Sequence, residues 1–196
     1  MEQLIKPTDC KTCHIKSLLF ESLNDKELEL ANKNKKEIIY KKKEVVCKEG
    51  EEIKELIYLK KGLIKLYKKG INNKDQILTI AKPLDFIGLL SIFLDTTYKY
   101  SISTLEDSTI CLIKINFIKE LVKNNGFFAL NLLKNMSKTY DDIIKTTFDI
   151  NSKQLRGRIA YIILYFSQYI YKSDYLIPIL VLEIFYLLQT HFPVIL

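Results

Sequence analysis

Short apolar runs separated by turn signals fill the stretch from about residue 38 to residue 115. The runs are rich in Ile, Val, Leu and Tyr, and their lysine-rich parts are typical of strands with one face in water. Glycine adopts a positive φ at little cost, and glycines lie between or at the ends of these runs at positions 50, 62, 70 and 88. Several short strands with frequent turns predict a β-sandwich or a barrel-like roll.

The apolar period becomes helical on both sides of this stretch. Before it, SLNDKELELA (residues 22–31) combines N-cap chemistry with helix-forming residues and predicts a short helix. After it, NFIKELVKNN is a short amphipathic segment, and Gly126 marks a break before a helix of about six turns over residues 127–150. A further helix is expected from Ser152 to Tyr171.

The long helix carries an apolar seam. Leu130, Leu133, Tyr140 and Ile144 fall near the three-and-four spacing that places residues on one side of a helix. Such a seam packs either against the roll of its own chain or against a second copy as a coiled coil, and the spacing supports both equally. We predict a homodimer with these four residues at the interface.

Composition narrows the class of protein. The chain has 196 residues, of which 48% are hydrophobic, enough for a folded core in one or two small domains. Its net charge of +7 favours acidic partners and identifies none of them. The first residues lack a charged region followed by an apolar one, so we expect no signal peptide and a cytoplasmic protein. No P-loop, nucleophile elbow or H-E-x-x-H motif is present, so we expect no enzyme.

Six segments, taken in chain order, carry a resemblance to a known family. They are CKTCHIKSLLFESLNDKELE, KKKEVVCKEGEE, LIYLKKGLIKLY, PLDFIGLLSIF, STLEDSTICLIKINFIKEL and KQLRGRIAYIILYFSQ. In this order and spacing, over roughly residues 10–172, they resemble the Crp/Fnr family of transcription regulators.

The resemblance implies an α+β fold. An N-terminal antiparallel β-roll of the cyclic-nucleotide-binding type, related to the jelly roll, would be followed by a long dimerisation helix and a short helical C-terminal remnant. The implied domains are a β-roll sensor with short flanking helices at residues 1–125, a dimerisation helix at residues 126–150, and an incomplete or degenerate helix-turn-helix region at residues 151–196.

The segment PLDFIGLLSIF resembles the one that holds the nucleotide phosphate in family members that bind a cyclic nucleotide. The resemblance places an effector pocket at Phe86, Ile87, Gly88, Leu89, Leu90, Ser91, Lys99 and Ser101. Leu89 and Leu90 stand where the family has a glutamate for the ribose, and no arginine precedes Arg156. Lys99 is the nearest cation, and a lysine holds a phosphate only as a point charge. We therefore expect no binding of cyclic AMP, and we expect the interior of the roll to be filled by Ile87, Leu89, Leu90 and Phe93.

The cysteines are candidates for a metal ion or a cluster. Cys10-x-x-Cys13 could place two thiolates on one ion or cluster. Cys111 lies where oxygen-sensing members of the family carry a distant cluster ligand, but Leu19 replaces their third N-terminal cysteine. A [4Fe–4S] cluster would then need another ligand, such as Asp9 or His14, and a zinc ion at Cys10, Cys13 and His14 would lack a fourth.

Ordinary reduced thiols are the favoured interpretation, with Cys47 and Cys111 buried in strands, because unmodified cysteine buries readily. An iron–sulfur cluster or a zinc ion at Cys10, Cys13 and Cys111 is the alternative.

The resemblance also implies DNA binding. Arg156 and Arg158 lie in the segment that leads into the family's DNA-binding domain, so we expect them to be DNA-proximal. Residues 175–196, YLIPILVLEIFYLLQTHFPVIL, contain neither lysine nor arginine, the side chains that supply most non-specific DNA affinity. This stretch fits either a shifted reading frame or a genuine tail. Pro178 and Glu183 interrupt it, so we expect no membrane helix.

The sequence predicts an effector-sensing, dimeric transcription regulator of the Crp/Fnr type by descent, with DNA binding impaired in this chain. The alternative is a stand-alone dimeric module that binds a ligand, or senses redox state or a metal, without binding DNA. The expected partners are a second copy of the chain, a small-molecule effector that the sequence does not identify, and promoter DNA as far as the resemblance holds.

Overall fold

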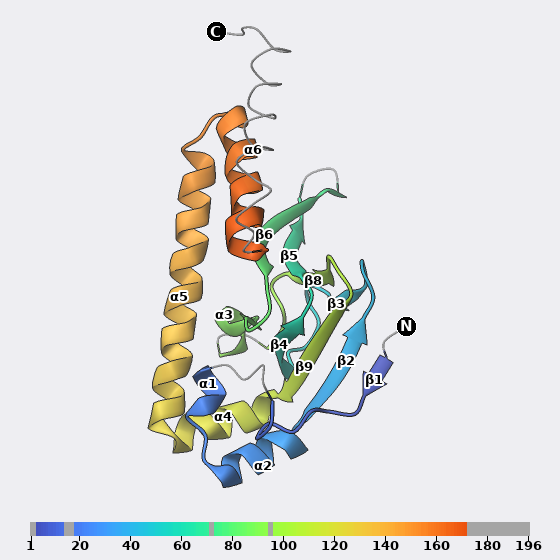
Figure 1. The fold of residues 1–196 in the computed structure, drawn as a ribbon, viewed down its shortest axis with the longest axis vertical. Coiled ribbons are helices and arrows are strands. Elements are labelled where there is room, and N and C mark those ends of the chain that lie inside the picture. The colour runs from blue at the N-terminus through green and yellow to red at the C-terminus, as the bar shows by residue number, and fades with distance from the viewer. Residues whose placement is uncertain (1–2, 14–17, 71–72, 94–95, 172–196) are drawn as a thin grey trace, which may run out of the picture. The chain divides into compact units, whose positions relative to one another are not determined.

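The computed structural model describes residues 3–13, 18–70, 73–93 and 96–171 (Figure 1). The chain divides into two compact units, residues 1–139 and residues 140–196, which are described separately. No helix in the described ranges is long and apolar enough to cross a membrane.

Two antiparallel sheets build the first unit (Figure 1). One sheet has the order β1 (Gln3–Ile5), β2 (Lys35–Tyr40), β9 (Ser108–Lys114), β4 (Glu55–Lys61) and β7 (Phe86–Ile87). The other has the order β3 (Val45–Cys47), β8 (Ser101–Thr104), β5 (Ile64–Lys69) and β6 (Asp75–Ala81). The predicted antiparallel β-roll of an α+β protein is confirmed.

Helices flank and follow the roll. They are α1 (Leu18–Glu21), α2 (Asp25–Lys33), α3 (Leu89–Ile92), α4 (Ile115–Asn124), α5 (Gly126–Asn151) and α6 (Leu155–Leu164), which continues as a π-helix over Tyr165–Ile170. Figure 1 shows α1, α2 and α4 gathered at one end of the sheets. The long helix that the sequence predicts is α5.

The first predicted helix begins three residues later than the pattern indicated. Asn24 is the N-cap of α2: its side chain accepts from the backbone N–H of Glu27, and the Glu27 carboxylate accepts from the backbone N–H of Asn24. This capping box satisfies two of the N–H groups that a helix start leaves open. Ser22 instead donates from its hydroxyl to the carbonyl oxygen of Leu19 at 2.8 Å.

The core lies between the sheets and extends to the helices at the end of the roll. Its fully buried apolar residues include Leu19, Leu56, Leu59, Ile64, Ile102, Ile110, Ile118 and Phe128. The tight turn between β4 and β5 depends on Gly62, whose φ is +91° and where an added Cβ would lie 2.6 Å from the carbonyl oxygen of Asp107. Only glycine is tolerated there without strain.

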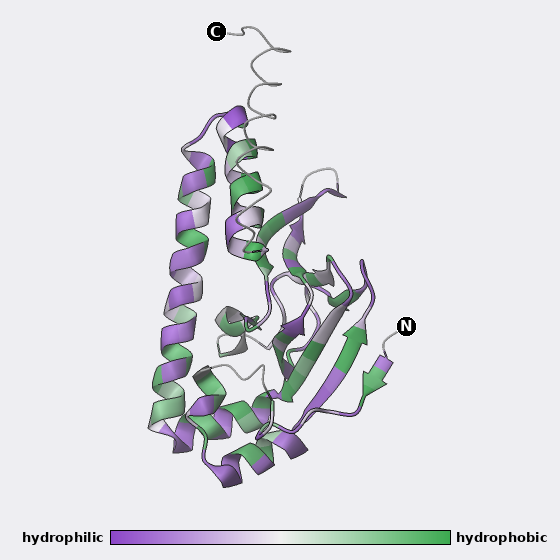
Figure 2. Cartoon of the chain, viewed as in Figure 1, coloured by the Kyte–Doolittle hydropathy of each residue, from purple (hydrophilic) through white to green (hydrophobic). Residues whose placement is uncertain are grey.

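Apolar and polar residues alternate along α5 (Figure 2). Phe128 and Leu132 on this helix are buried. The four predicted seam residues are exposed to solvent in the single chain, at 57% for Leu130, 57% for Leu133, 56% for Tyr140 and 48% for Ile144.

Candidate functional site

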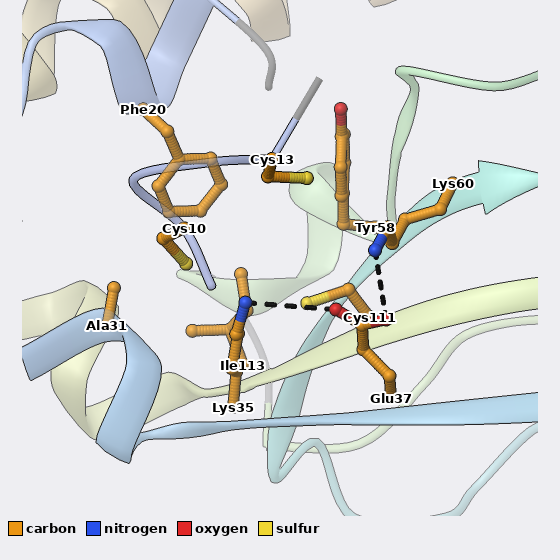
Figure 3. A pocket seen from close by; sticks show the side chains of 10 residues that line it. All are labelled: Cys10, Cys13, Phe20, Ala31, Lys35, Glu37, Tyr58, Lys60, Cys111 and Ile113. Carbon is orange, nitrogen blue, oxygen red and sulfur yellow. Dashed lines mark hydrogen bonds and ion pairs between the residues drawn. The ribbon is translucent and has the colours of Figure 1, made fainter. Parts of the chain in front are cut away.

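Three cysteines that are far apart in sequence line one cavity of the first unit. Figure 3 shows Cys10 and Cys13 from the N-terminal segment facing Cys111 of β9. The cavity has a volume of about 30 Å³. It is lined by Cys10, Cys13, Phe20, Ala31, Lys35, Glu37, Tyr58, Lys60, Cys111 and Ile113.

The register of three neighbouring strands places the charged residues beside Cys111. Cys111 of β9 lies opposite Glu37 of β2 on one side and opposite Tyr58 of β4 on the other. Lys35 and Lys60 lie two residues from Glu37 and Tyr58 along their strands, and side chains two residues apart share a face of a sheet. The alternation of side chains along these strands therefore places the four residues and Cys111 on one wall of the cavity.

The N-terminal segment forms the opposite wall and is held by hydrogen bonds. The strand β1 pairs with β2, with Gln3 opposite Ile39. The backbone N–H of Thr8 donates to Oε1 of Glu37 at 3.0 Å. The backbone N–H of Cys10 donates to Oδ1 of Asn32 at 2.8 Å. These contacts hold the cysteine pair over the sheet.

A turn shapes the Cys10-x-x-Cys13 segment. The backbone N–H of Thr12 donates to the carbonyl oxygen of Asp9 at 3.2 Å. The Asp9 carboxylate accepts from the backbone N–H of Lys11 at 2.8 Å and from the side chain of Asn32 at 2.7 Å. These hydrogen bonds lower the pKa of Asp9, first the one from Lys11 and then the one from Asn32.

A buried network of charges lies beside the thiols. Glu37 is 1% exposed, and its Oε2 lies 2.9 Å from Nζ of Lys60, whose side chain is 8% exposed. Nζ of Lys35, on a side chain that is 3% exposed, lies 3.7 Å from the other carboxylate oxygen. Lys60 also donates to the hydroxyl of Thr8 at 2.9 Å, and Lys35 donates to the carbonyl oxygen of Thr8. One carboxylate thus faces two ammonium groups in a region with little water.

The thiols differ in their surroundings. Cys10 and Cys13 are half-buried, whereas Cys47 and Cys111 are buried, as the sequence predicted. Burial raises the pKa of the Cys111 thiol to about 12, so that thiol keeps its proton at neutral pH. Burial alone would lower the pKa of Lys35, but hydrogen bonding to Cys10 and electrostatic attraction to Cys10 raise it overall.

The cavity is poorly suited to a metal ion or a cluster. In the part of the chain that the structure describes, no three His, Cys, Asp or Glu side chains are placed to hold one metal ion. Two ammonium groups also face the cavity, and they would repel a bare Zn²⁺. A cubane of four irons and four sulfides is far larger than a space of about 30 Å³. The residues in this arrangement therefore fit neither group. His14, the additional ligand considered from sequence, lies outside the described residues.

The predicted effector segment is packed into the roll. Phe86, Ile87, Gly88, Leu89 and Ser91 are buried. The Ser91 hydroxyl donates to the Tyr100 hydroxyl at 3.4 Å, and the Ser101 hydroxyl accepts from the backbone N–H of Glu49 at 3.0 Å.

Two details of this segment bear on the sequence predictions. Ile87 and Leu89 fill the interior as expected, but Phe93 is 43% exposed, so its predicted burial is wrong. It follows the last turn of the short helix α3, where the chain leaves the core. Lys99, the cation nearest the expected phosphate position, is exposed, and the side chain of Leu90 lies outside the described residues.

A second cavity, of about 210 Å³, lies on the inner face of the same sheet. Its lining includes the apolar or aromatic residues Ile38, Tyr40, Ile57, Tyr98 and Leu112, together with Cys47. The carboxylates of Glu51, Glu52 and Glu55 and the ammonium groups of Lys36 and Lys54 complete the lining. A surplus of negative charge does not suit a nucleotide phosphate.

The predicted DNA-proximal residues lie in the second unit. Arg156 and Arg158 are exposed. The Arg158 guanidinium donates to the carbonyl oxygens of Ile150 at 3.0 Å and Lys153 at 2.8 Å, at the C-terminal end of α5. The expected remnant of a helix-turn-helix falls largely on residues 172–196, outside the described residues.

Sequence analysis missed Lys35, Glu37 and Lys60 as parts of the site. A weak signal was present, because Lys35 and Glu37 stand two residues apart in KKEIIY and so share one face of a strand, although Lys36 between them is charged as well. That pattern is also typical of a solvated strand face, so it did not by itself indicate burial.

Comparisons with known proteins agree with the fold of the first unit. Residues 37–125 match the family model of the cyclic nucleotide-binding domain. The first unit thus has the fold of a cyclic nucleotide-binding domain. An uncharacterized protein of Haemophilus influenzae is 29% identical over 96 residues, which are 49% of this chain and 74% of that protein.

Solved structures extend the likeness to regulators. A putative transcriptional regulator of the Crp/Fnr family from Eubacterium rectale superposes with a TM-score of 0.66 at 20% identity, over 75% of this chain and 69% of the other. The sensor domain of the transcriptional regulator DNR from Pseudomonas aeruginosa gives 0.57 at 21% identity, over 65% and 85%. The resemblance to the Crp/Fnr family that the sequence predicted is confirmed in the fold.

Proposed function

We propose that this chain is the sensor part of a dimeric transcription regulator, and that its signal enters at the cysteine cavity. The carrying observation is the convergence of Cys10, Cys13 and Cys111 on one cavity beside a buried network of charges. Polar groups at such a density inside a protein are costly unless they are paired, and they concentrate where a protein does chemistry or binding.

The segment expected to hold a cyclic nucleotide also supports the cysteine cavity as the place where the signal enters, because this segment lacks the polar groups that a cyclic nucleotide needs. Its apolar residues Ile87 and Leu89 are each 2% exposed and occupy the core. A ribose needs an acceptor for its hydroxyl and a cyclic phosphate needs a cationic partner, and their loss costs about 1–3 kcal/mol each. The chain offers Leu89 and Leu90 in place of the carboxylate, and no arginine before Arg156.

The exposed seam on α5 supports a homodimer. Phe128 and Leu132 on this helix are already buried within the chain, whereas Leu130 and Leu133 are more than half exposed. A helix that leaves a row of large apolar residues in water gains stability by pairing with a second copy, as in a coiled coil. Dimerisation and a cytoplasmic location belong to this proposal, and specific binding of promoter DNA, the partner that the family resemblance implies, is expected to be impaired in this chain.

Isothermal titration calorimetry of the reduced full chain tests the choice of signal. Cyclic AMP and cyclic GMP at millimolar concentration should give no binding heat. Micromolar affinity for either nucleotide would contradict the proposal.

Sedimentation velocity at micromolar concentration tests the dimer. The wild-type chain should sediment as a dimer, and the double variant Leu133→Asp and Ile144→Asp should sediment as a monomer because charges would enter an apolar seam. Lys138→Asp is the matched control, since Lys138 is exposed on the same helix and lies away from the seam. A monomeric wild type, or a monomeric Lys138→Asp variant, would count against this interface.

A further inference from the structure

The charges around the cysteine cavity do not balance. Glu37 carries one negative charge, and the ammonium groups of Lys35 and Lys60 lie 3.7 Å and 2.9 Å from its two oxygens. All three side chains are less than a tenth exposed. The lining therefore has a surplus of positive charge, because two ammonium groups share one carboxylate, and a surplus of buried charge is unfavourable.

The sulfur of Cys10 is the group best placed to respond to this surplus. Burial raises the pKa of the two other acidic groups deep in the lining, the Tyr58 phenol and the Cys111 thiol, so both remain neutral. Lys35 lines the same cavity as Cys10, and the interaction with Cys10 raises the pKa of Lys35 against the effect of burial. Negative charge that develops on the Cys10 sulfur during a reaction is thus stabilised by an ammonium group that is already in position.

Cys10 and Cys13 are arranged so that they can reach each other. Residues 10–12 form a turn, held by the hydrogen bond from Thr12 to Asp9. Cys10 lies inside this turn and Cys13 follows it directly, and both side chains line the same cavity. A Cys-x-x-Cys spacing is one at which two thiols can form a disulfide. Both thiols are half-buried, so a small reactant reaches them, whereas Cys111 is 5% exposed.

The size of the cavity suits a small reactant. A space of roughly 10–15 Å³ holds one water molecule. The cavity of about 30 Å³ therefore has room for a molecule with two oxygen atoms, such as hydrogen peroxide.

We propose that Cys10 and Cys13 form a peroxide-sensitive dithiol, in which Cys10 is the reacting thiol, Lys35 positions and stabilises it, and Cys13 completes the disulfide. This inference rests on the proposed function, because it specifies the chemistry of the same site. It replaces the metal or cluster that the cavity does not fit.

The reaction balances in two steps. The Cys10 sulfur attacks one oxygen of hydrogen peroxide, the O–O bond breaks, and the second oxygen leaves as hydroxide and takes the thiol proton to become water. The Cys13 sulfur then attacks the sulfenic acid sulfur, the S–O bond breaks, and the hydroxide leaves as a second water with the Cys13 proton. One peroxide is reduced by two electrons, and two thiols are oxidised to one disulfide.

The disulfide would loosen the N-terminal segment. Lys35 loses its contact with a sulfur that can carry negative charge, although it also donates to the carbonyl oxygen of Thr8. That carbonyl and the Thr8 N–H connect β1 to the buried network. The expected result is weaker protection of the pairing between β1 and β2 after oxidation.

Peroxide titration of the reduced full chain, followed by thiol blocking and peptide mass mapping, tests the proposal. The expected product is a disulfide between Cys10 and Cys13 that has lost two hydrogens. Cys10→Ser should abolish it, and Cys13→Ser should stop at a sulfenic acid on Cys10 that dimedone traps. Cys47→Ser is the matched control, because Cys47 is buried elsewhere in the roll, and it should react like the wild type.

The rate of oxidation tests the role of Lys35. Lys35→Met should slow oxidation by about tenfold, the effect of losing one hydrogen bond to a charged group, and Lys35→Arg should restore most of the rate. Circular dichroism of each variant checks that the fold is kept. Equal rates for Lys35→Met and wild type would refute its role.

First oxidation at Cys47 or Cys111, or a wild-type rate for Cys10→Ser, would overturn the dithiol. Different results would refute the dithiol and the proposed function. A dimer that binds no cyclic nucleotide but leaves Cys10 and Cys13 reduced refutes only the dithiol, and a chain that forms the disulfide but binds cyclic AMP refutes only the proposed function.

Discussion

Replacing Glu37 by glutamine is expected to destabilise the β-roll by about 3–5 kcal/mol, the cost of breaking a buried ion pair. The Glu37 carboxylate lies 2.9 Å from Nζ of Lys60 and 3.7 Å from Nζ of Lys35, and it accepts the backbone N–H of Thr8 at 3.0 Å. Glutamine keeps the size and the hydrogen bond to Thr8. It leaves two buried ammonium groups without a negative partner.

Urea unfolding followed by far-ultraviolet circular dichroism at pH 7 measures the loss. With a slope of about 2 kcal/mol per molar urea, a loss of about 4 kcal/mol lowers the midpoint by about 2 M. Glu55→Gln is the matched control, because Glu55 pairs with Lys36 at the same distance of 2.9 Å but the two side chains are 25% and 46% exposed. A partly exposed pair contributes about 0–1 kcal/mol.

A double variant of Glu37→Gln with Lys60→Met should recover part of the loss, because one of the two unpaired ammonium groups is gone. Equal midpoints for Glu37→Gln and Glu55→Gln would refute the reasoning, since the buried network would then contribute no more than a surface pair.

Three further predictions each rest on a single feature of the structure or of the sequence. Gly62→Ala should lower the free energy of unfolding by about 1–3 kcal/mol, because its φ is +91° and the new Cβ meets backbone, and an unchanged urea midpoint would contradict this. Burial raises the pKa of the Cys47 and Cys111 thiols from 9.0 to about 12. The thiols of the unfolded chain therefore lose their protons first, and the free energy of unfolding falls as the pH rises from about 9, by at most about 1.4 kcal/mol per pH unit for each thiol. Urea midpoints at pH 8 and pH 10 should therefore differ more in the wild type than in the Cys47→Ala and Cys111→Ala double variant, and equal slopes would count against it. Mobility-shift assays with excess competitor DNA at physiological salt should show no specific retention, because residues 175–196 contain no lysine or arginine. Retention of one promoter fragment would show that the chain binds DNA specifically.

The hydrophobic periodicity of the sequence was sufficient to predict the fold but not to predict the cysteine cavity. Short runs with glycines between them predicted the roll, and a long amphipathic stretch predicted α5, because hydrophobic period reports directly which face an element buries. The start of α2 was misplaced, since Ser22 and Asn24 both have N-cap chemistry and only the capping box with Glu27 selects between them. Phe93 was assigned to the core because hydrophobicity does not reveal where a short helix ends.

The cysteine cavity depends on long-range register, which a single sequence does not contain. Cys111 meets Glu37 and Tyr58 only because β9 pairs with β2 and β4 in this register, and a shift by one residue would turn Cys111 to the other face. The three cysteines were nevertheless singled out by family resemblance. The lysines beside them were not, because Lys35 and Lys60 each stand next to another lysine and look like solvated positions.

Hydrogen exchange measured by mass spectrometry on the full chain tests most directly whether the signal enters at the cysteine cavity. The chain is compared in the reduced state, with millimolar cyclic AMP, and after reaction of Cys10 and Cys13. Thiol reaction is expected to raise exchange in Gln3–Ile5 and Lys35–Tyr40, whereas cyclic AMP is expected to change nothing. Protection by cyclic AMP across residues 86–93 and 98–101, with no change after thiol reaction, would contradict this prediction.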